Sequence, residues 1–84
     1  MESKNASEAT IKGSALLDDT HFTMGGEYQF GGMTRFHSGD IEITVDVNQH
    51  FRIISNSKNI LDLVIGGAHI KIPREQFNEV DVII

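Results

Sequence analysis

The fold is decided by residues 40–72, which read DIEITVDVNQHFRIISNSKNILDLVIGGAHIKI. Over residues 41–47, β-branched side chains alternate with polar ones, and this period of two is typical of a strand buried on one face. Three more apolar runs follow, separated by Asn, Ser and Gly residues that favour turns. The stretch therefore predicts a meander of four antiparallel strands, over residues 40–47, 51–55, 60–65 and 68–72.

The lengths of the three connections determine which side chains lie opposite one another. A three-residue loop at 48–50 keeps the aliphatic side chains on one face, whereas a two-residue loop would turn half of them outward. A connection at 55–59 and a Gly-Gly turn at 66–67 continue this aliphatic row. The opposite face then carries a cross-strand row of alternating charge, formed by Asp46, Arg52, Asp62 and Lys71.

The charged face of the predicted meander also carries several aliphatic side chains, which a solvated face does not need. We therefore expect the N-terminal half or a partner chain to cover part of it. The chain ends in a β-branched run over residues 79–84, interpreted as a strand that pairs with the sheet or with a neighbouring subunit. The predicted partner-binding residues are Ile54, Ile60, Val64, His69, Val82 and Ile84.

The flanking segments predict further short elements. Residues 9–17 indicate a short strand rather than a helix, because Gly13 and Ser14 weaken a helix. Residues 20–37 contain two Gly-Gly pairs, which divide them into three short strands. A single helical turn is expected near residues 74–78, directly after Pro73.

These elements predict an all-β fold, a small antiparallel sandwich or flattened barrel built on the meander. A polar, disordered tail over residues 1–8 precedes a single β domain over residues 9–84. The tail does not resemble a signal peptide, and no apolar run is long enough to span a membrane. With no cysteine in the chain, these features favour a cytoplasmic protein.

The net charge, the histidines and the carboxylates argue against several classes of function. The net charge of −5, spread along 84 residues, disfavours a nucleic-acid partner, which requires a basic surface. The four histidines do not have the spacing of metal ligands, so no metal site is expected. Acidic residues alternate with basic ones in the predicted row, which indicates a solvated surface rather than a pair of catalytic carboxylates. We therefore expect neither catalytic residues nor a cofactor.

The function that these features favour is a non-catalytic, acidic binding module that engages a protein partner or a second copy of itself. Small acidic β domains of this kind serve as inhibitors and regulatory subunits, phage-encoded ones among them. The alternative is a ring- or dimer-forming binder of nucleic acid or a small ligand, with sites between subunits. In that case four basic residues would have to converge, namely Arg35, Lys58, Lys71 and Arg74.

Overall fold

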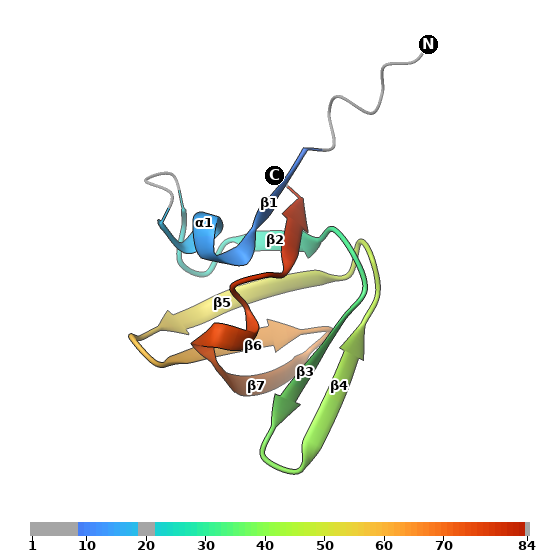
Figure 1. Ribbon diagram of the computed structural model, residues 1–84, viewed down its shortest axis with the longest axis vertical. Coiled ribbons are helices and arrows are strands. Elements are labelled where there is room, and N and C mark those ends of the chain that lie inside the picture. The colour runs from blue at the N-terminus through green and yellow to red at the C-terminus, as the bar shows by residue number, and fades with distance from the viewer. Residues whose placement is uncertain (1–8, 19–21, 84) are drawn as a thin grey trace.

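The computed structural model describes residues 9–18 and 22–83 (Figure 1). The predicted tail at 1–8 lies outside these residues. Within them, no helix is long and apolar enough to cross a membrane. In chain order the elements are β1 (Thr10–Lys12), α1 (Gly13–Asp18), β2 (Glu27–Phe30), β3 (Thr34–Ser38), β4 (Ile41–Val45), β5 (His50–Asn56), β6 (Ile60–Ile65), β7 (Ala68–Pro73), the 3-10 turn η2 (Arg74–Gln76) and β8 (Asp81–Ile83).

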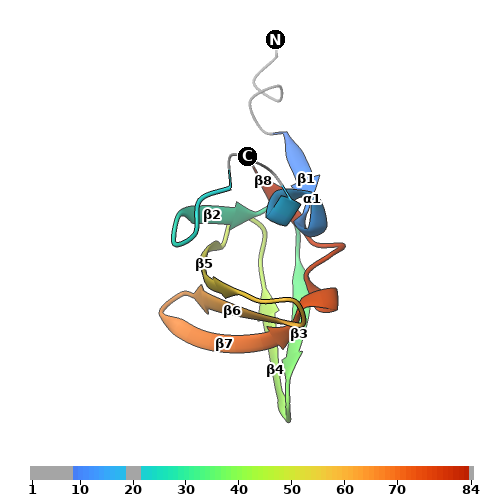
Figure 2. The ribbon, with the colours of Figure 1, turned by 90° about the vertical axis from the view of Figure 1, so that its left-hand side faces the viewer.

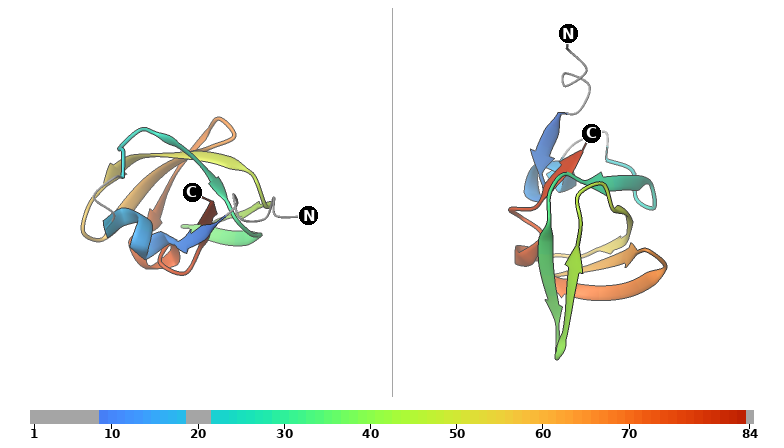
Figure 3. Two further views of the ribbon diagram at one scale, coloured as in Figure 1. Left: turned by 90° about the horizontal axis from the view of Figure 1, so that it is seen from above. Right: turned by 90° about the vertical axis from the view of Figure 1, so that its right-hand side faces the viewer.

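The strands form two antiparallel sheets, which confirms the predicted all-β class. The larger sheet has the order β1-β8-β2-β5-β6-β7, and the smaller one is the β3–β4 hairpin. The hairpin strands run across the direction of β5, β6 and β7, and the hairpin tip extends past β7 (Figures 1 and 2). The predicted C-terminal strand is present as β8, and it lies inside the sheet, between β1 and β2 (Figure 3).

The core lies on one face of β5, β6 and β7, where alternate side chains are buried as predicted. We call this the inner face. It is covered by α1, by buried side chains of the β3–β4 hairpin and by the segment after β7. The N-terminal half therefore packs on the inner face. It was one of two expected covers of the charged face, the other being a partner chain. The buried side chains from the covering segments are Leu16, Leu17, Phe36, Val45, Phe77 and Val80.

The predicted pairing of the first meander strand is wrong. Residues 41–45 form a strand, but β4 pairs with β3, so Asp46 does not lie opposite Arg52. Two features explain the difference. Gly39, with a φ of 64°, lies in a two-residue turn that folds β4 directly back onto β3. The place beside β5 is taken by β2, where Glu27 pairs with Arg52.

The remaining three strands form the predicted meander, with one change of register. The pairing of Asn56 with Leu61 changes the predicted β5–β6 connection, and a bulge lies between Ile53 and Ser55. Together they set Arg52 opposite Val64 rather than Asp62. The shift is by two residues, so every aliphatic side chain keeps its predicted face. The Gly-Gly turn is confirmed, with positive φ at both residues, and Asp62 lies opposite Lys71 as predicted.

The N-terminal segment combines a strand with a helix that was not predicted. Residues 10–12 form β1, and α1 begins at once at Gly13. The backbone N–H groups of Gly13 and Ser14 donate to the carbonyl oxygens of Val80 and Asn78, at 2.7 and 3.2 Å. These bonds satisfy donors that the first turn of a helix leaves without intrahelical partners. The contacts of residues 13 and 14 with residues 78–80 therefore outweigh the low helix propensity of glycine.

The other segment predictions are confirmed in part. Of the three strands predicted within residues 20–37, two are present, as β2 and β3. The described part of the remaining stretch, residues 22–26, forms a turn. Residues 20 and 21 lie outside the described residues. The predicted helical turn near residues 74–78 is confirmed as η2.

We expect the Gly13→Ala variant to lose about 1–3 kcal/mol of unfolding free energy, the usual cost of overpacking a core. A Cβ at Gly13 would lie 2.6 Å from the Phe77 ring, which is fully buried. Urea denaturation measures the loss. Ala15→Ser, at an exposed position on the same helix, is the control and should change stability by less than about 0.5 kcal/mol. Equal stability of the two variants would contradict this packing.

Candidate interaction surface

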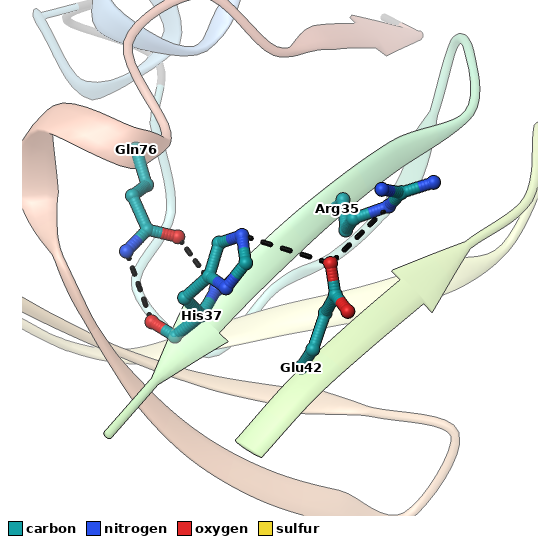
Figure 4. Close-up of polar contacts among 4 residues, drawn as sticks. All are labelled: Arg35, His37, Glu42 and Gln76. Carbon is teal, nitrogen blue, oxygen red and sulfur yellow. Dashed lines mark hydrogen bonds and ion pairs between the residues drawn. The ribbon is translucent and has the colours of Figure 1, made fainter. Parts of the chain in front are cut away.

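The polar face of the β3–β4 hairpin is organised around one carboxylate. Glu42 lies opposite His37, and Arg35 lies two residues before His37 on the same face of β3. Its Oε2 atom lies 3.4 Å from Nε of Arg35 and 3.7 Å from Nε2 of His37 (Figure 4). All three side chains are about half exposed or more, so these contacts orient the surface more than they stabilise it.

The side of β3 that faces away from β4 is held to the rest of the molecule by two side chains. Oε1 of Gln76 accepts from the backbone N–H of His37 at 2.8 Å, and Nε2 of Gln76 donates to its carbonyl at 2.9 Å (Figure 4). The Gln76 amide therefore bonds to β3 as a neighbouring strand would. Near the hairpin tip, Oγ of Ser38 donates to the carbonyl oxygen of Lys71 at 2.7 Å.

The opposite side of the hairpin is an exposed strand edge. Among the described residues, β4 pairs with β3 alone. Since the His37 backbone bonds to Gln76, the alternation of an antiparallel ladder directs the backbone groups of Glu42 and Thr44 away from β3. Both residues are exposed. We call this row of outward N–H and C=O groups, from Ile41 to Val45, the β4 edge.

The other two outer strands carry features that discourage strand addition. β7 contains Lys71 and ends at Pro73, which has no N–H group. β1 has only three residues and contains Lys12, whose Nζ lies 3.0 Å from a carboxylate oxygen of Asp81. This hydrogen bond and the charge of Asp81 raise the pKa of Lys12. β4 has neither lysine nor proline, and its register with β3 continues without a bulge.

Shallow hollows flank the hairpin on both faces. The hollow near Thr44, of about 210 Å³, is lined by Met33, Thr34, Arg35 and Thr44. The one near the tip, of about 300 Å³, is lined by Ser38, Ile41, His69, Ile70 and Lys71. Ile41 is 61% exposed and Met33 is 70% exposed, so both hollows have an accessible apolar side chain. A strand added at the β4 edge would have room for side chains on either face.

The predicted partner-binding residues are only partly on the surface. Within the described part of the chain, Ile54 and Ile60 are more than 40% exposed and Val64 is half-buried. His69 is exposed, and its Nε2 lies 3.9 Å from a carboxylate oxygen of Asp62. Val82 is fully buried in the interior strand β8 and is not accessible to a partner in this fold. Ile84 lies outside the described residues.

The four basic residues of the alternative prediction do not converge. Lys58 and Arg74 line one cleft of about 480 Å³, together with Asn59, Pro73, Glu75 and Asn78. Nη1 of Arg74 donates to Oδ1 of Asn56 at 2.7 Å, which directs the guanidinium toward the β5–β6 connection. Arg35 and Lys71 line the two hollows beside the hairpin instead. Within the described part of the chain, no group of three or more His, Cys, Asp or Glu side chains could hold a metal ion.

We expect Gln76→Ala to lower the unfolding free energy by about 1–2 kcal/mol, because it removes two hydrogen bonds to His37. Gln76→Glu should lose roughly half as much, since a carboxylate still accepts from the N–H group but cannot donate to the carbonyl. Urea denaturation gives both values. Glu75→Ala, an exposed neighbour, is the control. If amide exchange at His37 is no faster in Gln76→Ala than in the unmodified protein, the attachment of β3 by Gln76 is refuted.

No family model, curated protein or solved structure matches this chain. The β4 edge was not among the residues predicted from the sequence, because residues 40–47 were expected to pair with residues 51–55. The two-residue turn at Gly39 is the signal that identifies the hairpin.

Proposed function

We propose that this protein is a non-catalytic, acidic binding module that engages a protein partner by accepting one of its strands at the β4 edge. The observation that carries the proposal is that β4 is accessible and contains no lysine, proline or bulge, while β3 is attached by Gln76 and Ser38. The free edge is therefore presented by a hairpin that is fixed to the core. In recognition by strand addition, backbone hydrogen bonds provide affinity and alternate side chains provide specificity.

The attachment of the hairpin favours binding energetically. A flexible arm would lose conformational freedom when a partner strand is added, and this loss would reduce the affinity. Here Phe36 and Val45 are buried in the core, so the hairpin is ordered before binding. A partner strand would also cover apolar surface of Ile41, which is 61% exposed, at roughly 25 cal/mol for each Å² removed from water.

The proposal predicts that Thr44→Pro abolishes partner binding and leaves the fold intact. The Thr44 N–H group points away from β3, so proline removes no hairpin hydrogen bond but deletes a donor at the β4 edge. Thr44→Ala keeps the N–H group and is the matched control. The measurement is affinity capture from a host lysate with all three proteins, followed by mass spectrometry. A partner must be retained by the unmodified protein and Thr44→Ala but lost with Thr44→Pro.

The same capture distinguishes the outer face of β5, β6 and β7 from the β4 edge. Ile54→Ser and Ile60→Ser reduce the exposed apolar surface on that outer face. If a captured partner is lost with these two variants but kept by Thr44→Pro, the site lies on the outer face and strand addition at β4 is wrong. Circular dichroism confirms that each variant is folded.

A second candidate function is the binding of a small anionic ligand in the cleft of Lys58 and Arg74. The convergence of these two cations on one hollow favours it. It predicts that inorganic phosphate or a mixed oligonucleotide shifts the amide resonances of residues 57–59 at low salt, and that Lys58→Ala weakens this effect several-fold. Lys71→Ala, which removes a cation away from the cleft, is the control. No shift at low salt would exclude this function.

A further inference from the structure

The β4 edge and the residues on either side of it carry charge of one sign. Between residues 40 and 47 there are three acidic residues, Asp40, Glu42 and Asp46, and no basic one. All three are exposed. The nearest cation on β3 is Arg35, which already contacts Glu42 at 3.4 Å. A strand added at this edge would therefore lie beside a row of carboxylates that is only partly neutralised.

This charge acts against pairing between two copies of the chain. In a symmetric antiparallel pair of β4 strands, centring on Glu42 sets that residue opposite its own copy. Centring on Ile43 sets Asp40 opposite Asp46, and centring on Thr44 sets Glu42 opposite Asp46. Each of these three registers opposes like charges, which is destabilising in a cross-strand pair. The carboxylates therefore protect an edge that has no lysine, proline or bulge.

We propose that the strand received at the β4 edge is a basic extended segment of another protein, in which Lys or Arg alternate with apolar residues. This inference rests on the proposed function and names the chemistry of its partner. On the polar face, the basic side chains would lie beside Glu42 and Asp46. On the other face, apolar side chains would pack against Ile41 and Ile43, next to the hollow of about 300 Å³ at the hairpin tip.

The alternation of the partner follows from the alternation of β4. Directly opposite side chains in an antiparallel pair lie about 4.5–5.5 Å apart at Cβ, within reach of a Lys or Arg head group. A basic residue placed on the apolar face would instead meet Ile41 and Ile43 and lose hydration without gaining a counter-charge. The edge should therefore discriminate between segments of equal composition but different spacing of charge.

The test uses synthetic peptides as probes of the isotope-labelled protein. One has the sequence Lys-Val-Lys-Val-Thr-Val-Lys-Val, the second replaces each Lys with Glu, and the third contains the residues of the first with the three Lys consecutive. We expect the first to shift the amide resonances of Glu42 and Thr44, and to bind about tenfold more tightly than either of the others. Its affinity should fall as salt is raised, because the pairs are exposed.

Variants in which the carboxylates are replaced by amides provide the second part of the test. The triple variant Asp40→Asn, Glu42→Gln, Asp46→Asn keeps the shape of the edge, and we expect about tenfold weaker binding of the first peptide. The matched control is Asp18→Asn, Glu75→Gln, Glu79→Gln, which changes the net charge equally but outside the hairpin. It should bind as the unmodified protein does. Sedimentation should also show more self-association for the first triple variant than for the control.

The outcomes separate this inference from the proposed function. If the three peptides bind equally and Thr44→Pro abolishes binding of each, strand addition stands and the basic partner is wrong. If the first peptide binds Thr44→Pro unchanged, the attraction is not strand addition, and both proposals are refuted. Equal weakening by the two triple variants would also overturn the inference, because net charge rather than the β4 edge would then be responsible.

Discussion

The stacking of aromatic rings around Phe51 is the interaction on which the rest of the structure depends. The ring of Phe51 lies 4.1 Å from that of Phe30 and about 6 Å from those of Tyr28 and Phe77, measured between centroids. These residues come from β2, β5 and the segment after η2. Phe30 in turn contacts Phe36 of the hairpin at 5.8 Å. One buried cluster therefore joins both sheets and the C-terminal segment, in a chain too small for a second core.

The position of the β3–β4 hairpin follows from this cluster. Because Phe36 is buried against Phe30, the inner face of the hairpin packs on the core and its polar face points to water. Gln76 and Ser38 then bond one edge of the hairpin, and the remaining edge is that of β4. A surface for recognition is thus placed on a regular element whose position is set by packing. Such a surface is more accurately positioned than one on a loop.

The sequence predicted the local features of the fold and missed several of the long-range ones. The Gly-Gly turn before β7 was predictable because a two-residue turn between apolar runs fixes the pairing of its neighbours. The neighbour of β4 was not, since alternation shows which face of a strand is buried but not which strand lies beside it. The register of β5 with β6 was missed for a related reason, because a shift of two residues leaves the alternation unchanged.

The candidate site was harder to predict than the fold. Its definition depends on Gln76, whose side chain bonds to a backbone 39 residues away in sequence. Nothing in a Pro-Arg-Glu-Gln stretch indicates such a contact. An apolar terminal run indicates burial in general but not which surface does the burying, and the structure buries Val82 within its own sheet.

The interior position of β8 affects when the protein can fold during its synthesis. β8 lies between β1, near the start of the described chain, and β2, so neither can complete its hydrogen bonds until residue 83 has left the ribosome. Until then β2 has an open edge, and the carbonyl groups that cap α1, from Asn78 and Val80, are missing. The nascent chain therefore reaches its final topology late, after the hairpins of its middle have formed.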